Sequence, residues 1–308
     1  METSIPKVSV VMACYNSERY LAEAIGSIRE QSFRDFELII VNDGSTDRSL
    51  EIAQEHARQD GRIRVIHCEH NRGISAALNR GVNEARAEWV AQMDSDDFSY
   101  PDRLQKQMDY LATHPEIICV GVFPLMVDEK RYPIIVLDIY HEKHEDIERE
   151  LLDGHGWALL APTSLFRRDM ALRIGGYRED MTTSMDTDFF LKLGELGKVA
   201  NVPEVLFEYR VHAKSVTHAR KAGQVEQHNM ALRDAYARRN LQKAVPEETS
   251  AADNVTPADH HLRWGWQAFN SGYSRTAQRQ GLLAVARQPW RLEGWKLLAC
   301  VFRSRLQS

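Results

Sequence analysis

The first 115 residues alternate between short apolar runs and amphipathic segments, and this alternation constrains the fold more strongly than any other feature. Apolar runs rich in β-branched residues cover 8–13, 36–41, 63–66 and 89–93. Segments with helical periodicity follow the first three runs, at 18–31, 48–59 and 75–87. Strands that alternate with such helices are typical of parallel βαβ units, and continuous apolar strands indicate a sheet covered on both faces. The sequence therefore predicts an α/β fold with a parallel sheet flanked by helices.

Each of the four predicted strands ends in a polar loop. These loops contain Asn16, Asp43, Gly73 and Asp94. In open parallel sheets, ligands bind at the carboxyl ends of the strands. We therefore expect these four residues to converge at one edge of the sheet. In the first loop, Ser17 is expected to cap the helix that follows it.

Three aspartates, Asp94, Asp96 and Asp97, lie within four residues directly after the fourth apolar run. Adjacent carboxylates repel one another unless a cation offsets their charge, and hard cations such as Mg²⁺ or Mn²⁺ prefer oxygen ligands. Strand alternation would point Asp94 and Asp96 the same way, so that one metal ion could meet both. The alternative is a solvated acidic loop in which Asp97 caps the next helix. The spacing alone leaves both interpretations open.

The loop at 43–47, with the sequence Asp-Gly-Ser-Thr-Asp, follows a buried strand and precedes a helix. Asp43 could accept hydrogen bonds from a base or a ribose, while Gly44 would let a ligand approach the backbone. A turn stabilised by its own side chains, with Ser45, Thr46 or Asp47 as the helix cap, would use the same residues without a ligand. Neither GxxxxGK[ST] nor a GxGxxG after the first strand occurs, so the two commonest nucleotide motifs of this architecture are missing.

Asn71, Arg72 and Gly73 stand at the start of the third predicted helix and are followed by small residues. This pattern suits the close approach of a helix to a ligand or to a strand. Taken alone, helix packing explains it.

The pattern becomes irregular after residue 116. We expect a strand at 117–122 and helices at 144–152 and 186–196. Asp186 stands at the start of the last of these helices and could act as a general base, because a carboxylate within reach of a hydroxyl can take its proton. Helix capping would explain the same acidic residue without catalysis.

The last quarter of the chain has a different character. A polar stretch at 241–260 is expected to be a linker or long loop, and a helical region rich in tryptophan follows it. The segment 288–305 combines aromatic and apolar side chains with arginine and lysine. Such a helix could lie on an anionic membrane surface. Packing onto the remainder of the chain, or onto a second copy in a homodimer, is the alternative.

Composition excludes several classes of protein. Of 308 residues, 43% are hydrophobic and 27% are charged, which fits a soluble globular protein. The net charge of −5 offers no general attraction to nucleic acid. Four widely spaced cysteines suit a reducing compartment. The N-terminus is not typical of a signal peptide, and no stretch is long and apolar enough to span a membrane, so a cytoplasmic location is expected.

Seven segments together carry a resemblance to a known family. They are, in chain order, VSVVMACYN, ELIIVNDGSTD, NRGISAALNRG, MDSDD, GGYRED, MDTDFFLKL and LFEYRVH. In this order they resemble the inverting glycosyltransferases of family 2, of the kind that build bacterial polysaccharides, over residues 5 to about 215. The resemblance implies the Rossmann-like GT-A fold of nucleotide-diphospho-sugar transferases, an α/β fold with a mixed, mostly parallel sheet flanked by helices. It also implies a nucleotide-sugar donor, usually a UDP-sugar, Mn²⁺ or Mg²⁺, and direct displacement at the anomeric carbon.

The resemblance also implies a domain organisation and an acceptor. Residues 1–218 would form the catalytic domain, with a nucleotide-binding half at 5–115 and an acceptor half at 116–218. Residues 219–308 would form a helical C-terminal extension. The expected acceptor is a glycan or a lipid-linked glycan of the cell surface. The protein would then be cytoplasmic, with peripheral contact at the inner face of the membrane.

Residue roles follow from the matched positions. Asn16 or Tyr15 and Asp43 would hold the uridine, Asp94 would face the ribose or the sugar, and Asp96 would bind the metal. The wider donor site is expected to include Glu18, Asn71, Gly73, Ser95 and Arg210.

On the acceptor side, Asp186 falls where the family keeps its catalytic base. Met185 replaces the glutamate that precedes this base in the family, which puts the surroundings of the base in question. His212, in the Tyr-Arg-x-His segment, would assist metal or diphosphate binding.

Two other functions remain open. A nucleotidyltransferase that makes sugar nucleotides would share the sheet and the metal aspartates, but it would carry a glycine-rich basic loop after the first strand, and CYNSERY at 14–20 is not one. A non-catalytic protein that only binds sugar nucleotides is the second alternative. Met185 favours it, whereas Asp96 and Asp186 argue for catalysis.

Overall fold

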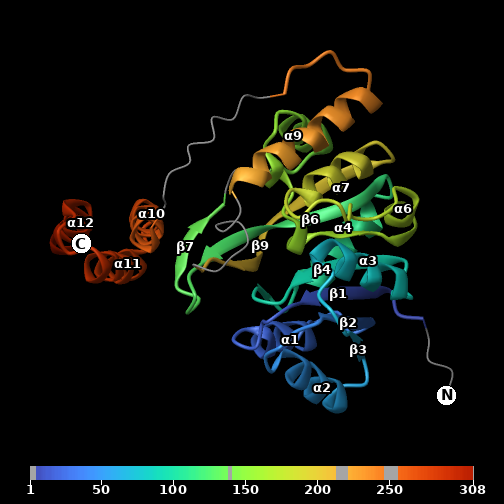
Figure 1. Cartoon of the computed structure of the whole chain (residues 1–308), viewed down its shortest axis with the longest axis horizontal. Coiled ribbons are helices and arrows are strands. Elements are labelled where there is room, and N and C mark those ends of the chain that lie inside the picture. Colours follow the sequence, from blue (N-terminus) through green and yellow to red (C-terminus); the bar gives the residue numbers. More distant parts are fainter. Residues whose placement is uncertain (1–4, 138–140, 213–220, 246–255, 308) are drawn as a thin grey trace. The chain divides into compact units, whose positions relative to one another are not determined.

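The computed structural model describes residues 5–137, 141–212, 221–245 and 256–307 (Figure 1). The chain divides into two compact units. The first contains Met1–Phe123, Asp138–Phe207 and Ala222–Thr249, and the second contains Pro124–Leu137, Glu208–Lys221 and Ser250–Ser308. The domain boundaries derived from the sequence stay a prediction.

The first half of the first unit consists of the expected parallel strands and helices (Figure 1). Strands β1 and β2 pair in parallel, β1 also pairs in parallel with β4, and β2 pairs in parallel with β3. The strands are β1 (Val8–Cys14), β2 (Phe36–Asp43), β3 (Ile63–Cys68) and β4 (Trp89–Asp94). The helices between them are α1 (Leu21–Arg29), α2 (Ser49–Gln59) and α3 (Ile74–Glu84). These elements confirm the strand and helix predictions for the first 94 residues.

Antiparallel strands extend this sheet and make it mixed. Its order is β3-β2-β1-β4-β8-β6-β9-β5, and β7 pairs with β6. Strand β8 runs antiparallel to both β4 and β6. The added strands are β5 (Phe98–Ser99), β6 (Ile117–Val127), β7 (Pro133–Val136), β8 (Leu165–Arg167) and β9 (Lys198–Arg210). The mixed, mostly parallel sheet is therefore confirmed.

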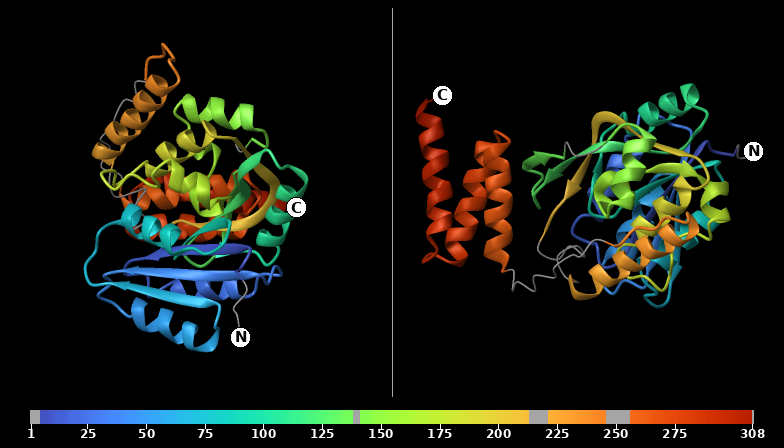
Figure 2. Two further views of the ribbon diagram at one scale, coloured as in Figure 1. Left: turned by 90° about the vertical axis from the view of Figure 1, so that its right-hand side faces the viewer. Right: turned by 90° about the horizontal axis from the view of Figure 1, so that it is seen from above.

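The remaining helices of the first unit include the two expected at 144–152 and 186–196. They are α4 (Arg103–Thr113), α5 (His144–Leu152), η1 (Gly156–Ala158), η2 (Ala161–Thr163), α6 (Arg168–Arg173), α7 (Met185–Gly194) and α9 (Lys221–Arg238). In the second unit, α10 (Pro257–Asn270), α11 (Ser274–Arg287) and α12 (Leu292–Gln307) lie side by side (Figure 2). Part of the expected linker at 241–260 lies outside the described residues, and α10 begins at Pro257.

The core of the first unit explains why α3 carries a glycine. Val11 of β1 and Ile39 of β2 are fully buried against α3, where Leu78 and Val82 face the sheet. A Cβ atom at Gly81 would lie 2.3 Å from Cγ1 of Val11, closer than real contacts allow. The helix can lie against β1 at this distance only because residue 81 has no side chain, and this close packing places the N-terminus of α3 beside the end of β2.

The second unit has its own apolar core and a well-formed helix start. Trp264, Ala277 and Leu297 come from the three helices and are buried together. The Thr256 side chain accepts from the Asp259 N–H, and the Asp259 carboxylate accepts from the Thr256 N–H, which forms a capping box at α10. In the part of the chain that the structure describes, no helix is both long and apolar enough to cross a membrane.

Candidate functional site

Hydrogen bonds tie the loop after β1 to the loop after β2. The Asn16 Oδ1 accepts from the Thr46 N–H at 2.9 Å, and the Asn16 N–H donates to the Ser45 Oγ at 3.0 Å. Asn16 adopts a φ of 51°, in the left-handed region that asparagine tolerates better than most residues. Its side chain is therefore engaged in fixing the loop, and Tyr15 beside it is exposed.

The same two loops are joined again one residue further on. The Glu18 N–H donates to the Asp47 carboxylate at 3.1 Å, and the Glu18 carboxylate accepts from the Arg48 N–H at 3.1 Å. The Ser17 N–H donates to the Ser49 Oγ at 2.8 Å. The expected cap is wrong, because α1 starts after Tyr20 and the Ser17 hydroxyl instead lies 2.7 Å from the Ser95 hydroxyl.

Asp43 connects the end of β2 to the start of α3. Its two carboxylate oxygens accept from the backbone N–H groups of Arg72 and Gly73, both at 2.9 Å. Asp43 is 3% exposed, and Gly73 has a φ of 94°. A Cβ atom at Gly44 would lie 2.6 Å from the Asn71 nitrogen, so only glycine fits where these loops meet. Asn71 itself lies exposed at this junction.

The alternative interpretation of the loop at 43–47 holds for one of its residues. The Asp47 carboxylate accepts from the Ser49 N–H at 2.9 Å, at the first residue of α2. Asp47 therefore satisfies the start of its own helix, whereas Asp43 contacts a different loop. The two acidic residues of this loop have separate roles.

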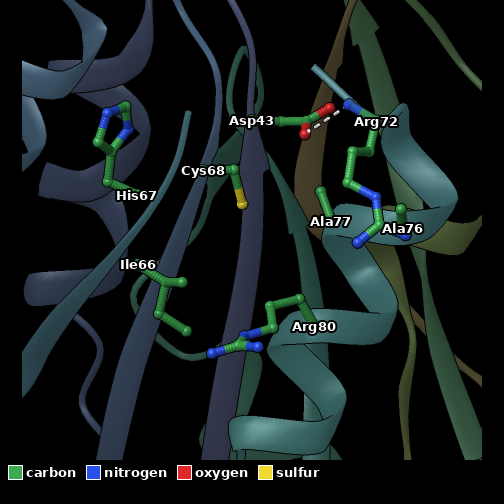
Figure 3. Close-up of a pocket in the computed structure, with 8 residues that line it drawn as sticks. All are labelled: Asp43, Ile66, His67, Cys68, Arg72, Ala76, Ala77 and Arg80. Carbon is green, nitrogen blue, oxygen red and sulfur yellow. Dashed lines mark hydrogen bonds between the residues drawn. The ribbon is translucent and has the colours of Figure 1, made fainter. Parts of the chain in front are cut away.

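A pocket of about 210 Å³ opens beside Asp43 (Figure 3). Figure 3 shows the Cys68 side chain between Asp43 and Ile66, and the Arg80 side chain reaching toward Ile66. The lining residues are Asp43, Ile66, His67, Cys68, Arg72, Ala76, Ala77 and Arg80. Whole drug-sized ligands occupy pockets of about 300 to 1,000 Å³, so this pocket suits one ring system of a larger ligand.

The aspartate cluster stands at the end of β4. One carboxylate oxygen from each of Asp94, Asp96 and Asp97 lies within 4.8 Å of the others. Burial and the neighbouring charge of Asp96 raise the pKa of Asp94 to about 7. A hydrogen bond from the Gln92 amide acts in the opposite direction, because it favours the ionised form. Ser95 is held by the Ser17 hydroxyl and is 9% exposed. Asp97 does not cap α4, which begins after Asp102.

Arg103 lies behind the cluster and was missed by the sequence analysis. It is fully buried, and its guanidinium donates to the carbonyls of Gln92 at 3.0 Å and Ser164 at 3.4 Å. Burial lowers the pKa of Arg103 to about 9, while the charges of Asp97 and Asp94 act in the opposite direction. The arginine supplies a positive charge beneath the carboxylates, and no motif in the sequence indicates it.

The donor atoms of the cluster fit a divalent cation. Carboxylate oxygens are the preferred ligands of Mg²⁺ and Mn²⁺, and a cation bonded at about 2.0 to 2.5 Å can bridge oxygens at this separation. The buried Arg103 places one positive charge beside Asp94 and Asp97. A divalent cation held by the three carboxylates would reduce their mutual repulsion further.

Asp186 is the second residue of α7 and lies in the same region as Asp94. The charge of Asp186 contributes to the raised pKa of Asp94, after burial and Asp96. The Asp186 Oδ1 accepts from the Thr187 N–H at 2.9 Å, so the carboxylate also satisfies the start of its own helix. Burial nevertheless raises the pKa of Asp186 above its ordinary value. Met185 is half-buried and packs against the core, where a glutamate would have to bury its charge.

Tyr177 connects the strand that carries the aspartates to the helix that carries Asp186. Its hydroxyl donates to the Gln92 Oε1 at 2.6 Å, and its ring stacks on Phe189 at a centroid distance of 4.1 Å. Burial raises the pKa of Tyr177 well above the ordinary value. This residue was also missed, because Gln92 and Tyr177 are 85 residues apart in the sequence.

Arg210 and His212 belong to the second unit. The Arg210 side chain is buried and its Nη1 donates to the Glu129 carbonyl at 3.0 Å. His212 is half-buried and follows the end of β9. The roles expected for both residues stay predictions.

A polar site at the carboxyl ends of parallel strands, with an acidic cluster whose oxygens suit a cation, is typical of α/β proteins that bind their ligand at this edge of the sheet. Comparisons with known proteins identify the class further. Residues 9–175 match the sequence profile of glycosyl transferase family 2. An uncharacterized glycosyltransferase of Haemophilus influenzae is 31% identical over 224 residues, which are 69% of this chain and 68% of that protein. The chain belongs to glycosyl transferase family 2 and is a glycosyltransferase.

Chondroitin synthase of Escherichia coli is a more distant relative, 26% identical over 253 residues. The aligned part is 78% of this chain but only 34% of the synthase. Among solved structures, Staphylococcus aureus TarS 1–349 in complex with UDP-GlcNAc has a TM-score of 0.64 at 18% identity, covering 98% of this chain and 92% of TarS. The mannosyltransferase PcManGT of Pyrobaculum calidifontis, in complex with GDP-Man and Mn²⁺, has a TM-score of 0.56 at 20% identity, covering 99% and 81%. The fold of the chain is GT-A.

Proposed function

We propose that this chain transfers a sugar from a nucleotide diphosphate sugar to an acceptor hydroxyl, with inversion at the anomeric carbon and with a divalent cation bound. The observation that carries the proposal is the position of Asp186. It is a half-buried carboxylate on its own helix, close enough to Asp94 to raise the pKa of that residue, and separate from the acidic cluster. The acidic cluster is thus available to bind a metal ion, and Asp186 is available to accept a proton.

The nucleotide is assigned to the pocket beside Asp43. A carboxylate offers about four lone-pair positions, and the two bonds from the backbone N–H groups of Arg72 and Gly73 leave about two for further donors. The ring N–H of a pyrimidine such as uracil is a donor of this kind, and Ile66 and Ala77 supply apolar contact for its face. We therefore favour a UDP-sugar. Tyr15, Asn16 and the loop at Asn71 would border the ribose.

The cation is assigned to Asp96 with its acidic neighbours, and the role expected for His212 stays a prediction. Mn²⁺ and Mg²⁺ both suit this donor set. When bound, such a cation offsets the negative charge that develops on the departing diphosphate. Arg210 is proposed to contribute to diphosphate binding.

Asp186 is assigned as the general base. It takes the proton of the acceptor hydroxyl while the oxygen attacks the anomeric carbon from the face opposite the diphosphate. The bond to the diphosphate oxygen breaks, and its electron pair leaves with that oxygen, which inverts the configuration. The transition state of glycosyl transfer has oxocarbenium character. Asp94 near the sugar would stabilise this positive charge.

The acceptor is proposed to be a glycan or a lipid-linked glycan, and the reaction to take place in the cytoplasm at the membrane. Support comes from the second unit, where Trp290, Trp295 and Phe302 are exposed and Lys296 and Arg303 are exposed beside them. Aromatic and cationic side chains together suit an anionic lipid surface. A second copy of the chain is the alternative partner for this surface.

A vesicle pelleting experiment distinguishes a lipid surface from a second copy of the chain as the partner of these exposed side chains. The full chain is compared with its Trp290→Ala/Trp295→Ala double variant on vesicles of phosphatidylglycerol and of phosphatidylcholine. We expect the full chain to pellet with the anionic vesicles and the double variant to remain in solution. Equal partitioning of both proteins would overturn the membrane assignment, and a concentration-dependent change in sedimentation that the double variant abolishes would assign the surface to a homodimer.

Release of nucleoside diphosphate tests the proposed reaction. A panel of UDP-, GDP- and dTDP-sugars is incubated with Mn²⁺, Mg²⁺ or EDTA, using wild type, Asp96→Ala and the exposed control Asp109→Ala. We expect metal-dependent turnover of one donor by wild type and the control, and its loss in Asp96→Ala. Nucleotide binding without turnover of any donor, also in the presence of glycan acceptors, would favour a non-catalytic binding protein. No turnover and no binding would overturn the donor site.

A further inference from the structure

Helix α9 begins after residue 220, beyond the part of the chain that resembles the family, yet it belongs to the same unit as Asp186. Several polar contacts hold it there. The Asp234 carboxylate accepts from Arg178 at 2.7 Å, and the Tyr236 hydroxyl donates to the Leu152 carbonyl at 2.6 Å. Near its C-terminal end, Arg238 pairs with Glu195 at 2.9 Å. The helix is therefore fixed against α5 and α7, on the side of the site that carries Asp186 (Figure 1).

Gln227 of α9 holds the loop that leads to Asp186. Its Oε1 accepts from the Thr182 N–H at 3.0 Å, the Thr183 N–H at 2.8 Å and the Thr183 hydroxyl at 2.8 Å. The next residue, Ser184, has a φ of 55°, a left-handed conformation that a serine keeps only when its surroundings impose it. Three hydrogen bonds to one side-chain oxygen fix the two residues before this turn. The direction in which α7 starts, and with it the position of Asp186, depends on them.

His228 is the next residue of α9, and it interacts electrostatically with Asp186. Burial raises the pKa of Asp186, and backbone hydrogen bonds lower it. The electrostatic effect of His228 also lowers this pKa, because it favours the ionised form of Asp186. A Cβ atom at Gly156 would lie 2.7 Å from the Thr187 hydroxyl and 3.8 Å from the His228 Cε1. The imidazole thus lies by the start of α7 and by η1. Its Nε2 is buried and has no hydrogen-bond partner among the residues that the structure describes.

In the proposed reaction, the Asp186 carboxylate changes charge when it takes the acceptor proton, so the titratable groups around it bear on this step. The other titratable groups that interact with Asp186 are Asp94 on β4 and Tyr177. Asp94 and Tyr177 contribute no positive charge, so among these groups only His228 can favour the ionised base by its charge.

We propose that Gln227 and His228 of α9 are positioning residues for Asp186, with Gln227 fixing the loop that aims the carboxylate and His228 lying beside the start of the helix that carries it. The inference rests on the proposed function, because it assumes that Asp186 is the base. According to this inference, the catalytic unit includes α9, which lies beyond the segment with recognisable motifs. The helix contributes to proton transfer and not to donor binding.

Variants of Gln227 test the first part. Gln227→Leu removes the accepting oxygen at similar size, Gln227→Glu retains it, and Glu226→Leu changes an exposed neighbour on the same helix. For Gln227→Leu we expect at least a tenfold loss of kcat for sugar transfer with an unchanged Kd for the nucleotide. Gln227→Glu should recover most of the rate, and Glu226→Leu should behave as wild type. If Gln227→Leu does not fold, Gln227→Asn, which shortens the side chain, is measured in its place with the same expectation.

The pH profile of kcat tests the second part. His228→Gln keeps a polar side chain but removes the imidazole and its electrostatic effect on Asp186. We expect the acid limb of its profile to move to higher pH than in wild type, because the ionised form of Asp186 loses its favourable partner. An unmoved limb would overturn the role of His228.

Two outcomes separate this inference from the proposed function. If Asp186→Asn abolishes transfer while Gln227→Leu retains the wild-type kcat, α9 has no positioning role and the base assignment stands. If Asp186→Asn transfers sugar as well as wild type, the base assignment fails and the inference fails with it. A loss of nucleotide affinity in Gln227→Leu that matches its loss of kcat would also overturn the inference, because it would indicate a general structural effect.

Discussion

The two sides of the site are constructed in different ways. On the proposed donor side, the loops after β1, β2 and β4 and the start of α3 contact one another directly through Asn16, Asp43 and Ser95. On the side of the proposed base, Asp186 depends on partners that are remote in the sequence, including Tyr177 through Gln92 and Gln227 through Thr183. The difference teaches that a ligand site formed by successive βα units can be recognised from motifs, whereas the tertiary contacts that hold the proposed base cannot.

Replacement of the base should have the largest effect. Asp186→Asn keeps the shape of the side chain and its bond from the Thr187 N–H, but it cannot accept the acceptor proton. General base catalysis contributes about 10²- to 10⁴-fold, so we expect the transfer rate to fall by about that factor. The rate is measured with saturating donor and acceptor. A fall of less than about tenfold would show that the base lies elsewhere.

Replacement of Asp43 should weaken the donor side. Asp43→Asn replaces the carboxylate that accepts from the N–H groups of Arg72 and Gly73, and it presents an amide to the uracil ring of the proposed donor. Hydrogen bonds to charged groups contribute about 1.5 to 3 kcal/mol, so we expect the Kd for the nucleotide to rise by about 10- to 100-fold. Calorimetry measures this change, with the exposed Asp35→Asn as the control. An unchanged Kd would remove Asp43 from the donor site.

The pH dependence should distinguish the two sides as well. Burial raises the pKa of Asp186, so we expect transfer to decline, as the pH falls, at a higher pH than an ordinary carboxyl group would give. A raised folded-state pKa also means that the ionised carboxylate destabilises the fold, and that this cost disappears at low pH. Asp186→Asn should therefore melt at a higher temperature than wild type at pH 8, with a smaller difference at pH 4. A lower melting temperature for the variant at pH 8 would contradict the account.

We expect the smallest effect from a substitution in the second unit, which contains neither the proposed donor loops nor Asp186. Thr256→Ala removes the side chain that caps α10, and loss of such a cap costs about 1 kcal/mol of stability. Thr256→Ser retains the hydroxyl and should be close to wild type. Chemical denaturation measures the stability, and calorimetry measures the nucleotide affinity, which we expect to be the same in all three proteins. A weaker nucleotide affinity in Thr256→Ala alone would show that the second unit contributes to the donor site.

The sequence predicted the elements whose causes are local. Apolar runs and helical periodicity were sufficient for β1 to β4, α2, α3 and α7, and the convergence of loops at strand ends followed from the parallel sheet. Arg103 could not be found in this way, because its position under the aspartates depends on carbonyls from β4 and from the segment before β8. Ser17 was misassigned because a hydroxyl near a helix start can bond to another loop instead of its own helix.

The base side shows the same limit more strongly. Asp186 could be named from its motif, but Met185 beside it could be explained only by its packing against the core. No motif in the sequence indicates Gln227 or His228. Both lie in a segment whose pattern is that of an ordinary helix. Their significance depends on which loop the helix contacts, and that is decided by the tertiary structure.

The division between the two sides is tested most directly by calorimetric titration of UDP into Asp186→Asn in the presence of Mn²⁺, beside wild type. If the donor is bound by the loops at the strand ends and Asp186 serves only the acceptor, the variant should bind UDP with the wild-type Kd although it no longer transfers sugar. A large loss of UDP affinity in this variant would contradict the account, because it would place Asp186 in the donor site.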